Sequence, residues 1–365
     1  MPRPAKVTID LSALRQNLVV AKRCSPNSEI VAVLKANAYG HGAIEVANAL
    51  QTSVSKFAVS SIEEALQLRE AGITSSILLL EGCFSASELL ICQQQQFDIV
   101  VHSQTQVDEL RAAVLLTPLR VWIKVDTGMH RLGMNEDQAY ATFKNLLGHK
   151  NVSATPVLMT HMASADLLDA NYTPEQHQRF CGLQSRLGQE GLTAQTSIGN
   201  SGTIMGWDGI DSDWSRPGIM LYGLSPFAEP HPHADKLRPV MALESEVIAL
   251  RTIEKGEKVG YGSTWTASRQ SRIATVAIGY GDGYPRNAKS GTPVLINGQR
   301  GALAGRVSMD MLSVDVTDLM EVQIGDAVEL WGNNLNANEV AQHADTIGYE
   351  LVTRMPIRVP KHYIN

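Results

Sequence analysis

Short apolar runs alternate with amphipathic segments over the first 230 residues of the chain. Eight of these runs read as buried strands of the parallel type: residues 30–35, 56–60, 76–80, 98–101, 121–125, 156–161, 194–198 and 213–216. The segments between them have helical periodicity, as in 62–72, which ends on a glycine, and 173–191, which opens on Thr-Pro. A short strand over 6–10 and a helix over 11–24 precede the series. This alternation predicts a (β/α)8 TIM-type barrel that ends near residue 230.

The pattern changes after residue 240, where strand-like runs follow one another with Gly, Pro and Asn turns between them. These runs cover 243–253, 272–280, 292–296, 312–318 and 327–332. One helical stretch is expected near 336–345, and the polar, proline-containing segment 227–239 reads as a linker. The expected fold class is therefore α/β, with a barrel domain over 1–230 and a mostly β C-terminal domain over 231–365.

Composition narrows the functional classes. The 365 residues are 44% hydrophobic and 19% charged, and the formal net charge of -6 offers no basic surface to nucleic acid or to an anionic membrane. The beginning of the chain lacks the apolar core of a signal peptide and no long apolar run suggests a membrane span, so a cytoplasmic protein is expected. The four cysteines, Cys24, Cys83, Cys92 and Cys181, are isolated and form no CxxC pair, which argues against a zinc site or a disulfide framework.

One lysine stands at an unusual place. Lys35 closes the apolar run 30–34 and is followed at once by small and polar residues. Burial lowers the pKa of an amine and makes it a usable nucleophile or base. A lysine that only extends its ammonium group into water at a strand end would explain the same pattern. This stretch alone leaves both interpretations open.

Other reactive side chains stand at the carboxyl ends of the predicted strands, where the βα loops of a barrel form the active site. Lys124 belongs to the fifth strand and His161 to the sixth, Ser201 follows the seventh, and Arg216 ends the eighth. The turn 216–219 can present backbone N–H groups and Ser201 adds a hydroxyl, so a phosphate group is expected there. A lysine that faces a phosphate pocket across the barrel mouth indicates pyridoxal phosphate, held as a Schiff base.

Six motifs, in order along the chain, carry a resemblance to a known family. They are VLKANAYGHG (33–42), KVDTGMHRLG (124–133), SRPGIMLYG (215–223), VGYGSTW (259–265), GYGDGYPR (279–286) and GRVSMDM (305–311). On these motifs the sequence resembles the bacterial alanine racemases over its full length. The resemblance implies a PLP-dependent enzyme that interconverts L-alanine and D-alanine, for peptidoglycan synthesis or for alanine breakdown. It also implies a homodimer in which the barrel of one chain meets the β domain of the other, with the first strand joining the C-terminal domain.

The reaction needs two bases, because the α-proton leaves from one face of the amino acid and returns to the other. The resemblance implies that Lys35 is one base and Tyr261, from the partner subunit, is the other. A tyrosine has an ordinary pKa of about 10, so cationic neighbours must favour the phenolate, and His161 and Arg216 could supply such a network. Without the family, Tyr261 reads as a structural aromatic in a Gly-Tyr-Gly turn and His161 as a buried core histidine.

The resemblance also implies ligands for cofactor and substrate. The cofactor set is Lys35, Tyr39, His161, Ser201, Arg216, Gly218 and Ile219. Arg216 would face the pyridine nitrogen, to which it can only donate. The substrate set is Arg131 at the carboxylate, Met309 through its backbone N–H, Asp310 in support of that loop, and Tyr280 at the entrance. Lys124, which would orient Arg131, carries a carbamate in many family members, and two cations so close together make that modification physically reasonable.

Two positions depart from the family. Many relatives have a histidine where this chain has Ser197, and some have a tyrosine at the phosphate site where this chain has Ile357. Three alternatives remain at this stage: a racemase of broader range that also takes serine, a barrel-type PLP amino-acid decarboxylase, and a single-domain PLP-binding carrier. The decarboxylase would be expected to use a cysteine-containing loop and a glycine-rich phosphate loop, and the carrier would lack residues 241–365.

Overall fold

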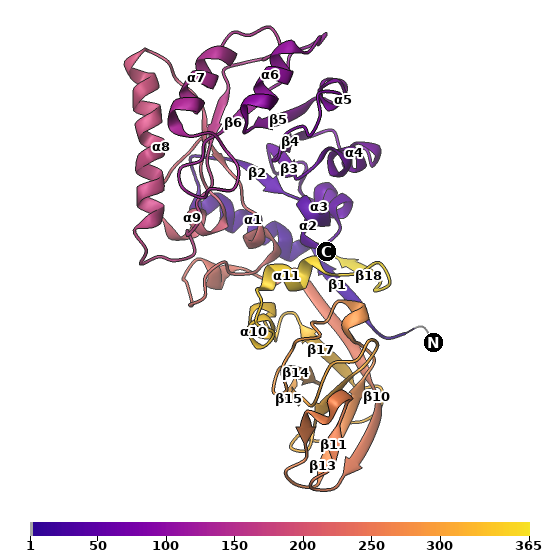
Figure 1. Ribbon diagram of the computed structural model, residues 1–365. Helices are drawn as coiled ribbons and strands as arrows, with labels where there is room; N and C mark the ends of the chain where they lie inside the picture. Colours follow the sequence, from indigo (N-terminus) through magenta and orange to yellow (C-terminus); the bar gives the residue numbers. More distant parts are fainter. Residues whose placement is uncertain (1–2) are drawn as a thin grey trace.

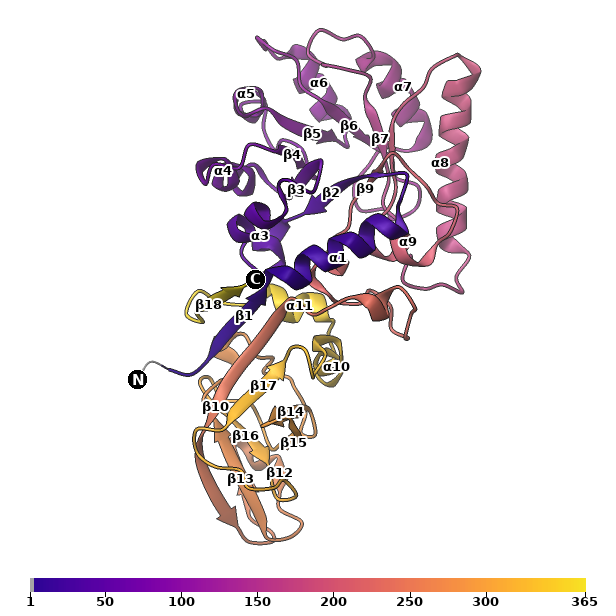
Figure 2. The same ribbon diagram turned by 180° about the vertical axis from the view of Figure 1, so that it is seen from behind.

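The computed structural model describes residues 3–365, which fold into two parts (Figures 1 and 2). A barrel ringed by helices forms one end of the molecule and an elongated β-sheet forms the other. Helix α11 (Gly348–Thr353) and strand β18 (Lys361–Ile364) lie at the junction, beside the start of the barrel. The last segment of the chain therefore packs close to the segment that contains Lys35.

The barrel consists of eight parallel strands that pair in sequence order, with the last closing on the first. They are β2 (Glu29–Val33), β3 (Lys56–Val59), β4 (Ser76–Leu79), β5 (Phe97–Val101), β6 (Val121–Lys124), β7 (Val157–Met159), β8 (Thr196–Ser197) and β9 (Trp214–Ser215). The predicted barrel is confirmed. Several strands end one or two residues earlier than predicted. Lys35 and His161 consequently lie in the loops that follow β2 and β7.

Helices cover the outside of the barrel. They are α1 (Leu11–Cys24), α3 (Ala43–Leu50), α4 (Ile62–Glu70), α5 (Glu88–Gln95), α6 (Gln104–Ala112), α7 (Glu136–Leu146), α8 (Tyr172–Gln189) and α9 (Ser201–Gly206). Local chemistry sets several of their ends. Asp10 accepts the N–H groups of Ser12 and Ala13 at 2.8 and 2.9 Å and so caps α1. Gly72, with φ of 84°, ends the segment of α4 in the left-handed conformation that glycine favours.

The second part is built on an eight-stranded sheet, in the order β13-β16-β15-β14-β17-β10-β1-β18. Its strands are β1 (Lys6–Asp10), β10 (Met241–Ile253), β13 (Ser271–Val276), β14 (Pro293–Ile296), β15 (Gln299–Leu303), β16 (Leu312–Asp315), β17 (Ala327–Trp331) and β18. A short hairpin, β11 (Lys258–Val259) and β12 (Trp265–Thr266), and helix α10 (Ala337–His343) complete it. Strand β1 pairs antiparallel with β10 and parallel with β18, so the first strand lies in this sheet.

A buried ion pair lies at the end of the barrel where its strands begin. Lys56 Nζ and an oxygen of Asp98 are 2.7 Å apart, and the indole N–H of Trp122 donates to the same carboxylate at 3.0 Å. The Lys56 amine also lies over the ring of Trp214, 5.7 Å from its centre. These groups satisfy one another, as buried charges must. They fill this end of the barrel, which leaves the opposite end for chemistry.

The four cysteines are free thiols, but they are not all isolated in space. The sulfur atoms of Cys83 and Cys92 are 3.6 Å apart and buried, because the loop after β4 packs on α5. The cysteines are isolated in the sequence, but the fold brings this pair together, since sequence spacing does not reveal contacts made through a loop. Among residues 3–365, no helix combines the length and the apolar character needed to cross a membrane.

Candidate active site

A cavity of about 1040 Å³ opens at the carboxyl ends of the barrel strands. The predicted residues that line it are Lys35, Tyr39, Lys124, Arg131, His161, Ser201, Arg216, Gly218 and Ile219. Helix α11, from the second part of the chain, contributes Tyr349 and Glu350 to the same wall. The residues that the sequence placed at the ends of separate barrel strands are thus brought together in one cavity.

An unusual backbone turn, directly after Lys35, orients this side chain. The four residues that follow it, 36–39, are not glycine, yet all have φ between 52° and 54°, so they form one left-handed helical turn. Such a conformation costs an L-residue about 1–2 kcal/mol, so tertiary contacts must hold it. The turn puts both Lys35 and Tyr39 on the cavity wall. Burial and then the charge of Arg131 lower the pKa of the Lys35 amine, which makes it a better base at neutral pH.

Tyr39 reaches over the turn that follows β9. A Cβ atom at Gly218 would lie 2.5 Å from the Tyr39 hydroxyl, so only glycine allows this approach. The hydroxyl of Ser201 accepts the N–H groups of Gly218 and Met220 at 3.0 and 3.3 Å and orders the same turn. Burial raises the pKa of Tyr39 to about 12, so its hydroxyl stays protonated and can donate. Hydroxyl and backbone groups gathered in this way suit an anionic oxygen group.

Arg216, which is buried, and His161, which is half-buried, form a pair with opposite protonation preferences. One Nη atom of Arg216 donates to Ser197 Oγ, and the other donates to the Thr160 carbonyl at 2.7 Å and lies 3.4 Å from His161 Nδ1. Burial lowers the pKa of Arg216 to about 10, so it remains a cation near neutral pH. Burial, and then Arg216 itself, holds the pKa of His161 well below its ordinary value. His161 is therefore neutral, and Arg216 alone supplies the cationic charge expected of this pair.

Lys124 ends β6 and lies close to other cations. Burial, followed by Arg216 and Arg131, lowers the pKa of its amine to about 8. A minor fraction of this amine is consequently uncharged near neutral pH. The electrostatic crowding predicted for Lys124 and Arg131 is present, because the charge of Arg131 helps to lower the pKa of Lys124.

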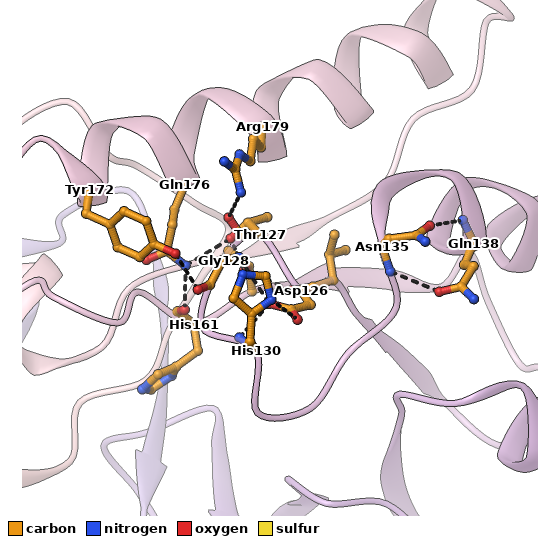
Figure 3. Close-up of polar contacts among 12 residues, drawn as sticks. Asp126, Thr127, Gly128, His130, Asn135, Gln138, His161, Tyr172, Gln176 and Arg179 are labelled. Carbon is orange, nitrogen blue, oxygen red and sulfur yellow. Dashed lines mark hydrogen bonds and ion pairs between the residues drawn. The ribbon is translucent and has the colours of Figure 1, made fainter.

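The loop that leads from Lys124 to Arg131 is pinned by its own residues and by helix α8, as Figure 3 shows. The carboxylate of Asp126 accepts the N–H groups of Gly128 and His130, both at 3.0 Å. From α8, the hydroxyl of Tyr172 donates to the Gly128 carbonyl at 2.5 Å and Arg179 donates to the Thr127 carbonyl at 3.2 Å. These contacts fix the loop that ends at Arg131.

Gln176 connects this loop to the loop of His161 (Figure 3). Its amide N–H group donates to Thr127 Oγ1 and to the His161 carbonyl, each at 3.2 Å, and its oxygen accepts the N–H of Ala163 at 2.8 Å. The side chain is buried, and its bond to Thr127 lies fully away from water. No motif pointed to Gln176, because its role depends on loops that the sequence does not place side by side.

Tyr349 is a cavity residue that sequence reasoning missed. Its ring centre lies 6.2 Å from that of Tyr39, and burial raises its pKa, so the hydroxyl is protonated. The sequence comparison looked instead to Ile357 for a missing tyrosine, but Ile357 is fully exposed and away from the cavity lining. A tyrosine at position 357 would therefore not line this cavity, whereas α11 brings a different tyrosine to it. Its only sequence signal was a lone aromatic in the short segment 348–353.

Four predicted residues do not line this cavity within one chain. Tyr261, Tyr280, Met309 and Asp310 all lie in the second part, and Tyr261 is 70% exposed. Strand β11, which directly precedes the Tyr261 turn, lies far from the barrel in Figure 1. The turns of Tyr280 and Met309 are joined, because the N–H of Gly281 donates to the Met309 carbonyl at 2.8 Å. Arg358 pairs with Asp310 at 2.6 Å and so braces that turn. One chain thus presents two separate groups of site residues.

Comparison with known proteins settles the family. Residues 9–226 match the family model for the alanine racemase N-terminal domain, and residues 240–363 match the model for the alanine racemase C-terminal domain. The chain belongs to the alanine racemase family. It is 50% identical to an alanine racemase from Pseudoalteromonas atlantica, with all of both chains covered. It is 47% identical to a catabolic alanine racemase from Pseudomonas putida, with 99% of each covered.

The fold agrees with solved structures of the alanine racemase family. The crystal structure of the biosynthetic alanine racemase from Pseudomonas aeruginosa superposes with a TM-score of 0.94 and is 46% identical, with all of both chains covered. Relatives with biosynthetic and with catabolic names thus resemble this chain to a similar degree. The family identification made from the six motifs is confirmed.

Proposed function

We propose that the protein is a pyridoxal-phosphate-dependent alanine racemase that interconverts L-alanine and D-alanine with two bases. The observation that carries the proposal is the single cavity that holds the Lys35 amine, the Arg216 guanidinium, and the Tyr39 hydroxyl above Gly218. Family membership supports the same reaction, because relatives named alanine racemase match the chain over its whole length.

The residues present fit pyridoxal phosphate. Lys35 offers a largely buried amine for covalent attachment, and the hydroxyls of Ser201 and Tyr39, beside the turn of Gly218 and Ile219, offer donors to a phosphate. Arg216 can only donate a hydrogen bond to the ring nitrogen, which would limit how strongly the ring withdraws electrons. When bound, the cofactor supplies an electron-withdrawing group that makes the α-hydrogen of the amino acid acidic.

The chain's own residues then bind the substrate and move its proton. Lys35 takes or returns the proton at Cα on the D side, and Tyr261 of the partner subunit does so on the L side. Met309 and Tyr280 come from the same subunit as Tyr261. Met309 lies toward the substrate carboxylate, Tyr280 lies at the entrance, and Asp310 stabilises their loop. The exposure of Tyr261 supports this division, because a base 70% open to water in one chain needs a second surface around it. The protein is accordingly a homodimer with shared active sites.

Arg131 binds the carboxylate of the substrate. Lys124 is carbamylated: the uncharged amine adds to carbon dioxide, forms an N–C bond and releases a proton, which leaves an anion in place of a cation. The pKa of about 8 for Lys124 supports this step, because the reaction needs a neutral amine. The resulting carboxylate would orient Arg131 instead of repelling it.

Labelling of the lysine and α-hydrogen exchange test the proposal together. Reduction of the holoenzyme with borohydride, followed by peptide mapping, should place the pyridoxyl group on Lys35. In deuterated water the enzyme should exchange the α-hydrogen of L-alanine and of D-alanine faster than that of serine or larger amino acids. A label on Lys124, or release of carbon dioxide and an amine, would contradict the proposed function. Rapid exchange of serine would favour the broader-range racemase.

A further inference from the structure

The Glu64 carboxylate joins the loop that carries Lys35 to the next loop of the barrel. One oxygen accepts the N–H of Ala36 at 2.6 Å, and the other accepts the N–H of Ser60 at 2.8 Å. Ala36 directly follows Lys35, and Ser60 directly follows β3. A single side chain thus connects the carboxyl ends of two neighbouring strands at the mouth of the cavity.

The position of Glu64 in α4 would suggest a different use. Ser61 is the N-cap residue and Glu64 is the third residue of the helix, which is the spacing of a capping box. In a capping box, the glutamate accepts the N–H of the N-cap residue itself, and the serine side chain caps in return. Here Ser61 makes no cap hydrogen bond, and the Glu64 oxygens go to Ser60 and Ala36. A broken local rule of this kind is a frequent sign of a functional site.

The Ala36 N–H is a sensitive point of the left-handed turn. The left-handed turn is strained, so contacts from other parts of the chain must determine how it is oriented. The N–H of Ala38 is satisfied by the Leu34 carbonyl at 2.7 Å, and the side chain of Asn37 accepts the N–H of Ala43 at 2.8 Å. The N–H of Ala36, at the start of the turn, is met by the charged Glu64 carboxylate from helix α4. A hydrogen bond to a charged group is stronger than one between neutral groups.

The Glu64 contacts continue toward the cavity. The Ser60 hydroxyl donates to Glu81 at 2.6 Å, and Ser60 and Glu81 both line the cavity that contains Lys35. Glu64 itself does not line the cavity. Glu64 therefore acts on Lys35 through the backbone of Ala36 and Ser60 and through its charge, which raises the pKa of the Lys35 amine against the effect of burial.

We propose that Glu64 is a positioning residue for Lys35, whose carboxylate fixes the direction in which the left-handed turn presents the amine to the substrate. The inference rests on the proposed function, in which Lys35 handles the proton on the D side. Because Tyr261 of the partner subunit handles the L side, an error in the direction of Lys35 should affect the two enantiomers unequally. A role limited to stability would affect both enantiomers equally.

The test replaces Glu64 by glutamine in the holoenzyme. Glu64→Gln removes the charge and turns an amide group toward one of the two N–H donors. Exchange of the α-hydrogen from D-alanine in deuterated water should fall about 10-fold to 100-fold, the range expected for a misplaced reacting group. Exchange from L-alanine should fall much less. In the cofactor-free protein, backbone amides of residues 33–42 should exchange faster with deuterated water.

The matched control is Glu63→Gln, since Glu63 is the exposed neighbour with the same charge. It should leave both exchange rates and the amide protection unchanged. Glu64→Asp keeps the charge but is shorter, and it should give an intermediate loss with the same bias against D-alanine, even if Glu64→Gln folds poorly. No loss, or an equal loss for both enantiomers with Lys35 still labelled in the wild type, would overturn the positioning role. A label on another lysine would overturn the proposed function instead.

Discussion

Burial is the largest influence on the pKa values of four residues in the cavity, Lys35, Lys124, His161 and Arg216. His161 and Arg216 lie 3.4 Å apart, yet the imidazole is neutral and the guanidinium charged, because burial lowers both pKa values and only that of arginine starts high enough to stay above neutral pH. The pKa of Lys124, about 8, lies between those of His161 and Arg216. The sequence identified these residue types but could not assign their charges, since burial arises from the fold.

Arg216 provides a prediction at this scale. Arg216→Glu places a carboxyl group, which can share a proton, opposite the ring nitrogen. The cofactor ring should then withdraw electrons more strongly. Racemisation should slow, and pyruvate from slow transamination should become measurable for each turnover. Arg216→Lys, which keeps a cation, should slow racemisation without pyruvate. If Arg216→Glu lowers only the cofactor content and pyruvate stays absent, the electronic role is wrong.

At the scale of elements, His41 stabilises the left-handed turn after β2 from a position two residues beyond the end of that turn. The imidazole is buried and its Nδ1–H donates to the carbonyls of Tyr39 and Ala38 at 2.8 and 3.1 Å. Its ring also packs on that of Tyr222, with centres 4.5 Å apart. Burial lowers the pKa of His41 to about 4, so the group is neutral in the folded protein.

This burial predicts a pH dependence of stability. The unfolded histidine has a pKa of about 6.5, so between about pH 6.5 and pH 4 the unfolded chain binds a proton that the folded chain does not. Stability from His41 is therefore present above pH 6.5 and is lost as the pH falls, by about 2 kcal/mol between pH 7 and pH 5. His41→Asn keeps a hydrogen-bond donor but does not titrate. Between pH 7 and pH 5 its free energy of unfolding, measured in urea, should therefore fall by about 2 kcal/mol less than that of the wild type. Equal losses would show that His41 is not a buried neutral group.

The elements differ in how far the sequence could predict them. The barrel strands were recognisable because strands buried on both faces read as continuous apolar runs. Strand β15 was missed because QRGAL lacks such a run, and β18 because KHYI is mostly half-exposed at an edge. The left-handed turn at 36–39 was not predictable from propensity, since alanine, asparagine and tyrosine there are held by contacts from α4 and α11.

At the scale of the whole molecule, the site residues fall into two groups that one chain does not bring together. The barrel cavity holds Lys35, and the exposed turns of the second part hold Tyr261 and Met309. The motifs predicted both groups, because each is a local stretch of sequence. Their meeting across two subunits is the central claim of the proposed function, and it predicts a specific defect. Tyr261→Phe should lower racemisation by at least about 100-fold and slow exchange from L-alanine more than from D-alanine.

The most direct test mixes two inactive variants, Lys35→Ala and Tyr261→Phe. In a hybrid dimer with shared sites, both defects fall in the same site and the other site keeps its lysine and its tyrosine. Mixing, after dissociation and reassociation of the subunits, should therefore restore partial racemase activity in proportion to the hybrid dimers formed. Each variant treated alone is the control and should stay inactive. Hybrid dimers that form but show no activity would mean that both bases come from one chain, which would contradict the shared site.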